Sequence, residues 1–166
     1  MIIIVFGLPG SGKSYFASKL AERINARYVN SDVIRRELFD VRKYSREEKM
    51  NVYNAMLREM KKAILQNKSI VLDATFYQRS IRNKFIEAVN EIGKRIIFIE
   101  IRAELKIITE RLSRKRENSE ADYSVYLQIK EVFEPMEEEH LILRSTQENI
   151  DKMLIMAINH MNKSHG

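Results

Sequence analysis

The chain has 166 residues, of which 45% are hydrophobic and 31% are charged, and its formal net charge is +6. These values are typical of a globular protein with one domain, and the excess of Lys and Arg weakly favours an anionic partner such as a nucleic acid or a phosphorylated compound. The absence of cysteine excludes disulfides, thiol nucleophiles and zinc–thiolate sites.

The longest apolar run, Ile2–Phe6, is the first expected strand and is too short to span a membrane. It lacks a basic leader and a small-residue cleavage site, so we expect no signal peptide. We therefore expect a cytoplasmic protein without a membrane partner.

The loop Gly7–Ser14 follows this strand and reads Gly-Leu-Pro-Gly-Ser-Gly-Lys-Ser, a complete G-x-x-x-x-G-K-S pattern. Its glycines let successive N–H groups curl around phosphates, and the next helix adds its positive N-terminal end. Lys13 would reach the β- and γ-phosphates, and Ser14 would offer its hydroxyl to Mg²⁺. A glycine-rich turn that matches by accident is the alternative, but a strand before the loop and a helix after it favour a triphosphate site.

The rest of the chain alternates apolar runs with amphipathic stretches. Further strands are expected at Arg27–Asn30, Ser69–Asp73, Lys94–Ile101 and His140–Arg144. Helices are expected at Lys13–Asn25, Ser45–Asn67, Ser80–Ile92, Glu104–Arg116, Asp122–Phe133 and Thr146–Met161. Ser45 and Glu48 form a capping-box pattern at the start of one helix. Because two strands are continuous apolar runs, we expect a three-layer α/β/α fold with a five-stranded parallel sheet.

Open parallel sheets bind ligands at the carboxyl ends of their strands, so the residues that follow each strand are candidates for chemistry. Asp32 follows the second strand and can accept a hydroxyl proton, while Arg35 holds an anion. The alternative is that Asp32 only caps a helix that begins there, and the two roles are compatible.

Asp73 ends the third strand, where phosphate-loop proteins often place a carboxylate associated with Mg²⁺. It could instead contact the acceptor or cap the next segment. Ala74 follows it where many motor-type ATPases have a glutamate that activates water, which argues against a hydrolase or a motor. The pair Asn67-Lys68 lacks the following aspartate of a guanine-reading motif, which argues against a GTPase.

A basic cluster, Arg111, Arg114, Lys115 and Arg116, lies late in an expected helix. One interpretation is a solvated helix end, since cations suit a helix C-terminus. The other is a lid whose arginines close over the transferring phosphoryl group, where positioned cations count most. Spacing does not choose among the arginines.

Taken together, these motifs resemble the P-loop kinases that include polynucleotide 5′-hydroxyl kinases, zeta-toxin and AAA-type ATP-binding domains and related small-molecule kinases. The likeness rests on residues 7–14, 30–35 and 71–75, with the arginine-rich segment and Phe133-Glu134-Pro135 adding to it. It spans nearly the whole chain and implies one P-loop kinase domain over residues 1–166, with a helical lid at about 103–135.

The resemblance implies a Mg²⁺·ATP-dependent kinase with defined roles for its residues. Asp32 would be the general base, Arg35 would grip an acceptor phosphate, and Arg114 or Arg116 would stabilise the transfer. Ser14 and Asp73 would serve the metal. The expected nucleotide contacts are Gly7, Pro9, Gly10, Ser11, Gly12, Lys13, Ser14, Tyr15 and Arg111.

The expected acceptor is a phosphorylated compound, with a nucleic-acid 5′ end as the leading case. This expectation rests on basic residues that follow the second and third strands: Arg35, Arg36, Arg42, Lys43, Arg79 and Arg82. The alternatives are a small-molecule kinase acting on an antibiotic, sugar or nucleotide, and an ATP-binding switch that phosphorylates nothing.

Overall fold

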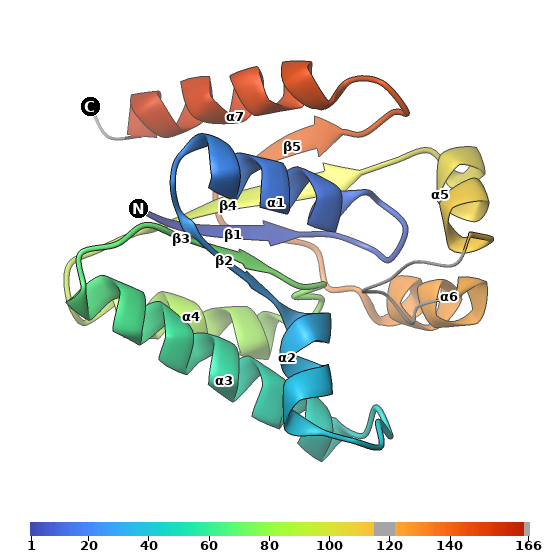
Figure 1. Ribbon diagram of the computed structural model, residues 1–166, viewed down its shortest axis with the longest axis horizontal. Coiled ribbons are helices and arrows are strands. Elements are labelled where there is room, and N and C mark those ends of the chain that lie inside the picture. The colour runs from blue at the N-terminus through green and yellow to red at the C-terminus, as the bar shows by residue number, and fades with distance from the viewer. Residues whose placement is uncertain (115–121, 165–166) are drawn as a thin grey trace.

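The fold is known from a computed structural model, which describes residues 1–114 and 122–164. Five parallel strands form one sheet in the order β2-β3-β1-β4-β5. Figure 1 shows α1 and α7 on one face of this sheet and α3 and α4 on the other. The predicted three-layer arrangement with a five-stranded parallel sheet is confirmed.

The strands are β1 (Ile2–Phe6), β2 (Arg27–Asn30), β3 (Ile70–Asp73), β4 (Ile96–Arg102) and β5 (His140–Arg144). The helices are α1 (Lys13–Arg23), α2 (Ser31–Leu38), α3 (Arg46–Leu65), α4 (Arg79–Asn90), α5 (Leu105–Leu112), α6 (Tyr123–Val132) and α7 (Ile150–Ser164).

Alternate residues of the central strand face the two helical layers. Ile4 and Phe6 of β1 pack with α3 and α4, whereas Ile3 and Val5 pack with α1 and α7. All five residues of β1 are buried, as expected for a strand covered on both faces. The continuous apolar run that predicted β1 is therefore the centre of both cores.

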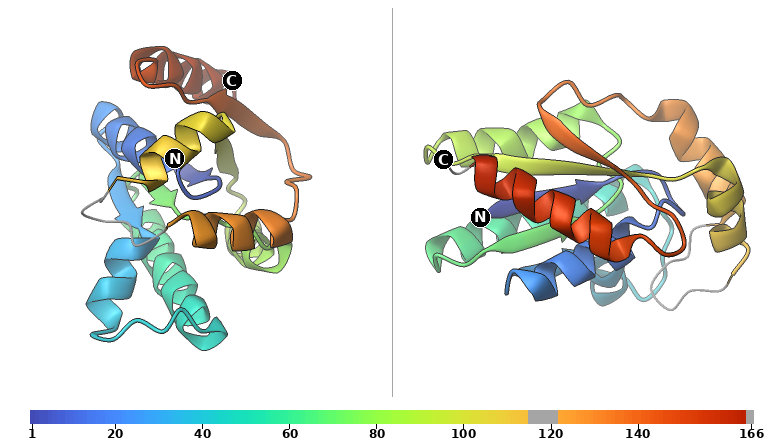
Figure 2. Two further views of the ribbon diagram at one scale, coloured as in Figure 1. Left: turned by 90° about the vertical axis from the view of Figure 1, so that its right-hand side faces the viewer. Right: turned by 90° about the horizontal axis from the view of Figure 1, so that it is seen from above.

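The register of the sheet brings the carboxyl ends of its strands to one edge. Val5 lies opposite Asp73, Asn30 lies opposite Asp73 from the other side, and Phe6 lies opposite Glu100. Figure 2 shows α5 and α6 lying across this same edge of the molecule. Loops after different strands thus meet under these two helices.

Helix α2 is not among the expected helices, although the cap interpretation of Asp32 implied one near it. The cap is Asn30 instead, because its side-chain oxygen accepts hydrogen bonds from the amides of Asp32 at 2.9 Å and Val33 at 3.1 Å. Asp32 therefore lies in the first turn of α2, and its carboxylate is not required as the cap.

Only half of the capping box predicted at α3 is present. Ser45 caps the helix by accepting from the Glu48 amide at 3.1 Å. The Glu48 carboxylate accepts instead from the amides of Lys43 at 2.7 Å and Tyr44 at 3.1 Å, so it orders the turn that precedes the helix. That turn includes Tyr44 at a positive φ of 54°.

Arg82 is the largest fully buried side chain of the fold, with 1% of its surface exposed. Its guanidinium donates to the carbonyls of Phe76 at 2.8 Å, Glu134 at 2.9 Å and Pro135 at 3.0 Å. Burial lowers the pKa of this guanidinium, and the nearby Glu138 opposes that shift. Arg82 thus anchors the segment after α6 to the loop after β3.

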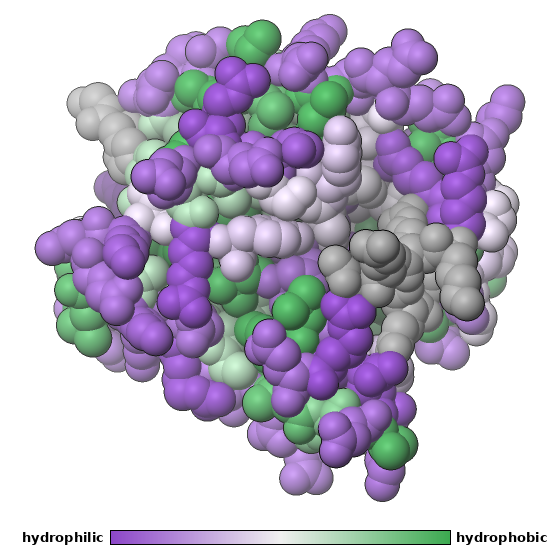
Figure 3. All heavy atoms as spheres, viewed as in Figure 1, coloured by the Kyte–Doolittle hydropathy of each residue, from purple (hydrophilic) through white to green (hydrophobic). Residues whose placement is uncertain are grey.

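No helix among the described residues is long and apolar enough to cross a membrane. Figure 3 shows hydrophilic residues over most of the face seen there, with hydrophobic side chains reaching it in separate groups.

We predict that Arg82→Met destabilises the fold by about 3 kcal/mol, because three carbonyls lose a charged hydrogen-bond donor, one of them in a buried contact. Urea unfolding of the two proteins measures the difference. Lys84→Met is the matched control, since Lys84 lies on the same helix and is exposed. A loss below about 1 kcal/mol for Arg82→Met would contradict the anchoring role, since that is the usual net effect of one ordinary hydrogen bond.

Candidate active site

Backbone geometry explains why the loop Gly7–Ser14 requires its glycines. Gly10 and Gly12 have φ of 78° and 91°, a region that side chains disfavour. A Cβ on Gly7 would lie 2.4 Å from the Ile101 carbonyl oxygen, so β4 leaves no room for a side chain there. The loop therefore presses against β4 and opens directly into α1, as its sequence predicts.

Two cavities flank this loop, and Gly12 and Ser14 border both. The first, called here the α2–α6 cavity, has a volume of about 380 Å³ and lies between the loop, α2, α3 and α6. The second, called the α5–α7 cavity, has a volume of about 580 Å³ and lies between the loop, α5 and the start of α7.

The α2–α6 cavity collects the residues that the sequence singled out after different strands. Five of them border it: Lys13, Ser14, Asp32, Arg35 and Asp73. These five side chains therefore lie together at the carboxyl edge of the sheet, as predicted. Their catalytic, phosphate-binding and metal-binding roles stay predictions.

Asp73 is fully buried and belongs to a network of hydrogen bonds beneath the loop. Its Oδ2 accepts from the Tyr28 hydroxyl at 2.6 Å and from Asn30 Nδ2 at 2.7 Å. Asn30 Nδ2 also lies 3.4 Å from Ser14 Oγ. Burial and the Asp73 carboxylate raise the pKa of the Tyr28 phenol, so this tyrosine keeps its proton at neutral pH and donates a hydrogen bond to Asp73.

Asp73 Oδ1 is buried without a hydrogen-bond partner among the described residues. A buried carboxylate oxygen normally has a donor or a cation nearby, because leaving it unpaired is costly. Asp73 and Ser14 border the same cavity and share Asn30 Nδ2 as a neighbour, which fits the two residues that the sequence analysis expected at a Mg²⁺ site.

Arg35 is buried, and its charge already has partners within the protein. Its Nε lies 3.3 Å from Glu48 Oε1, and its guanidinium carbon lies 4.7 Å from the centre of the Tyr44 ring. Only 9% of the Arg35 surface is exposed. Glu48 therefore offsets much of the positive charge of Arg35, which the sequence analysis expected to bind an acceptor phosphate.

Sequence reasoning missed one wall of the α2–α6 cavity, which contains Lys49 and three tyrosines, Tyr44, Tyr53 and Tyr77. Tyr53 is 95% buried, yet it also borders the cavity. A usable signal was present: Lys49 and Tyr53 are one helical turn apart at the end of α3 that meets the carboxyl edge of the sheet.

Arg111 connects the phosphate loop to the segment between β5 and α7. It donates to the carbonyls of Gly10 at 3.3 Å and Ser11 at 2.9 Å. Its other terminal nitrogen donates to Ser145 Oγ at 2.9 Å and to the Thr146 carbonyl at 3.0 Å. Arg111 borders the α5–α7 cavity, as does Tyr15, which is 60% exposed.

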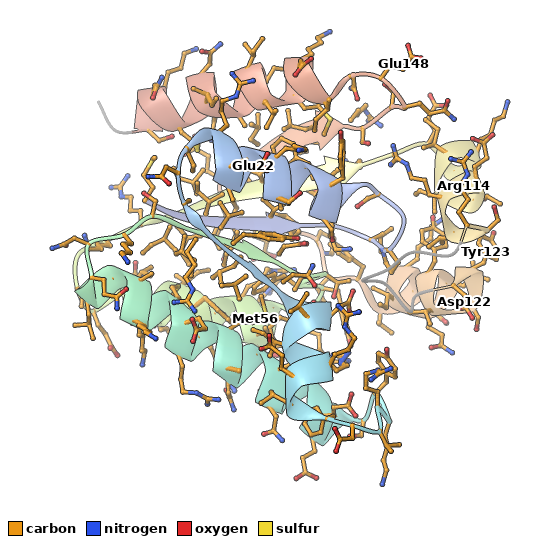
Figure 4. The ribbon with its side chains drawn as sticks, viewed as in Figure 1. Glu22, Met56, Arg114, Asp122, Tyr123 and Glu148 are labelled. Carbon is orange, nitrogen blue, oxygen red and sulfur yellow. The ribbon has the colours of Figure 1, made fainter. Side chains whose placement is uncertain are left out.

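The expected lid arginines are only partly described. Arg114 is exposed at the end of α5 and borders the α5–α7 cavity, and Figure 4 shows it on the same side of the molecule as Asp122 and Tyr123, where α6 begins. Lys115 and Arg116 lie outside the described residues.

Most of the basic residues expected around the acceptor are placed elsewhere. Of the six, Arg35 alone borders the α2–α6 cavity within the described part of the chain. Arg82 is buried in its anchoring contacts, and Arg79 pairs with Glu137 at 2.5 Å. The spacing of a cation after a strand does not reveal which side of a helix it occupies. The sequence analysis therefore overestimated the positive charge of the site.

Comparison with known proteins places the chain in a family. Residues 2–136 match the family described as the AAA domain. Over 116 residues the chain is 34% identical to the L-seryl-tRNA(Sec) kinase of Methanococcus maripaludis, an alignment covering 67% of this chain and 44% of that protein. The chain thus spans less than half the length of that curated relative.

Solved structures share the fold over nearly the whole chain. A gluconokinase from Sinorhizobium meliloti superposes with a TM-score of 0.75 and 17% identity, covering 98% of this chain and 91% of that one. The APS kinase of Mycobacterium tuberculosis, solved with AMPPNP and APS, superposes with a TM-score of 0.70 and 15% identity, covering 97% of each chain. The chain belongs to the AAA domain family and has the fold of the P-loop kinases.

Proposed function

We propose that this protein is an ATP-dependent kinase that transfers the γ-phosphate to a hydroxyl group of an acceptor bound in the α2–α6 cavity. The observation that carries this proposal is the phosphate loop between two cavities, one of which holds Asp32. A nucleotide in the α5–α7 cavity would direct its phosphates along the loop toward that carboxylate. The similar proteins named above are kinases, which supports a kinase activity for this chain.

Each residue of the site then has a defined task. Loop amides and Lys13 would hold the β- and γ-phosphates, and Asp32 would orient the acceptor hydroxyl and take its proton as the oxygen attacks. Arg111 would set the width of the nucleotide site, because it joins the loop to Ser145 and Thr146. Arg114 or Arg116 would neutralise charge on the transferred group, and α5 and α6 would serve as the lid.

The residues present fit a Mg²⁺ ion, since Ser14 offers a hydroxyl and Asp73 Oδ1 a buried carboxylate oxygen without a partner. When bound, the ion would neutralise phosphate charge and orient the triphosphate. Asp73 would help Ser14 to hold the ion, while Tyr28 and Asn30 keep its other oxygen in place.

A compact acceptor is better supported than a nucleic-acid 5′ end. The α2–α6 cavity of about 380 Å³ suits a small molecule. Nucleic-acid binding relies on several unpaired cations that contact phosphates, whereas Arg35, Arg79 and Arg82 are engaged within the protein. A non-catalytic ATP switch is less supported, because it needs neither Asp32 nor an enclosed acceptor cavity.

We predict that Asp32→Asn lowers phosphoryl transfer by roughly 10²- to 10⁴-fold, the usual contribution of a general base. Transfer of a ³²P label from γ-labelled ATP to the acceptor measures this loss, and nucleotide affinity should stay unchanged. Asp40→Asn is the matched control, because Asp40 is exposed and does not border the cavity. Near-normal transfer by the Asp32 variant would remove Asp32 from the role of base.

We predict that Gly12→Ala weakens ATP binding at least tenfold. The added Cβ would lie 2.7 Å from an Arg111 nitrogen and 2.8 Å from Ser145 Oγ, so it would displace the contacts that shape the nucleotide site. Titration with a fluorescent ATP analogue measures the affinity.

Gly93→Ala is the control for backbone strain alone, because Gly93 also has a positive φ of 63° but no atom within 4 Å of an added Cβ. Both variants should lose some stability, of the order of 1 kcal/mol. Equal ATP affinity in the two variants would contradict the placement of the nucleotide beside Arg111.

A further inference from the structure

Lys49 is a partly buried cation that borders the α2–α6 cavity. Its ammonium donates to the Tyr77 hydroxyl and lies 4.5 Å from the centre of the same ring. Within residues 1–114 and 122–164, no carboxylate forms an ion pair with it. Burial and the charge of Arg35 lower its pKa, as expected for an ammonium short of negative charge.

The two other cations at the cavity, Lys13 and Arg35, do not compete for an acidic group of the acceptor, because Lys13 would hold the phosphates of ATP. Arg35 has the Glu48 carboxylate at 3.3 Å, so this pair contributes little net charge. The remaining acidic groups at the cavity, Asp32 and Asp73, are placed for the transferred phosphate and its metal. Lys49 is therefore the group best placed to balance a negative charge on the acceptor.

Part of the cavity lining is aromatic and apolar, in contrast to the polar residues contributed by α2 and the loop after β3. Tyr44 and Tyr77 line one side, and the cavity-facing residues of α6 include Val125, Ile129 and Val132. Gln128 is the one polar residue that α6 adds to this lining among the described residues. Hydroxyls of a polyol that faced this part of the lining would stay unpaired, whereas a flat ring packs well between tyrosine and branched aliphatic side chains.

We propose that the acceptor is a compact aromatic anion: a flat ring with a hydroxyl group directed at Asp32 and one acidic group bound by Lys49. This inference rests on the proposed kinase function and specifies its substrate class. Lys49 is a specificity-determining residue, and Tyr77 orients its ammonium. Carboxylate and phosphate share the chemistry that Lys49 recognises, and the test below separates them.

The experiment measures kcat/KM for ³²P transfer from ATP to five probes. Two are aromatic anions, 4-(hydroxymethyl)benzoate and 4-(hydroxymethyl)phenyl phosphate. The others are the neutral 4-(hydroxymethyl)benzamide, the anionic polyol gluconate and a 5′-hydroxyl oligonucleotide. We expect an aromatic anion to exceed the amide at least tenfold, and the better of the two identifies the acidic group.

The Lys49→Met variant tests the residue itself. We expect it to remove the preference for anion over amide, mainly by raising KM for the anion. Lys49→Arg should keep part of the preference. Lys61→Met should keep all of it, because Lys61 is exposed on the same helix and does not border the cavity.

The outcomes separate this inference from the proposed function. Use of the benzamide equal to that of both aromatic anions, preferred use of gluconate or the oligonucleotide, or an unchanged preference in Lys49→Met would each overturn the inference while the kinase function stands. ATP binding without transfer to any probe also overturns the proposed acceptor class. Failure to bind ATP at all would refute the kinase function itself.

Discussion

The side chain of Asn30 connects the parts of the site that must be placed relative to each other. Its oxygen caps α2 through the amides of Asp32 and Val33, and its nitrogen donates to Asp73 and lies beside Ser14. One amide group therefore sets the start of the helix that carries Asp32 and Arg35, and also the position of the buried carboxylate. Because Asn30 lies opposite Asp73 in the sheet, strand pairing fixes this connection.

Much of this arrangement follows from local sequence. The apolar run Ile2–Phe6, the glycines after it and the rule that parallel strands end at one edge were sufficient to predict where the loop, Asp32 and Asp73 would meet. These features depend on strand direction and backbone conformation, which nearby residues determine. The predicted helices are present for the same reason, with ends that shift by a few residues.

Charge was harder to predict than position. Arg82 resembles an acceptor-binding cation in the sequence, yet it is buried against the carbonyls of Glu134 and Pro135, more than fifty positions along the chain. Arg35 likewise meets Glu48 only because α2 folds back on α3. Such pairs depend on how helices pack against each other, which periodicity does not encode. The same packing gives Lys49 no carboxylate partner within residues 1–114 and 122–164, a contrast that only the folded arrangement reveals.

The shared border of the two cavities at Gly12 and Ser14 bears on how donor and acceptor bind during the reaction. Donor and acceptor in the proposed kinase would occupy opposite sides of one thin loop and would be bound at the same time. Steady-state kinetics would then follow a ternary-complex rate law rather than a ping-pong one. A single in-line displacement across the loop would also invert the configuration at a chiral γ-phosphorus.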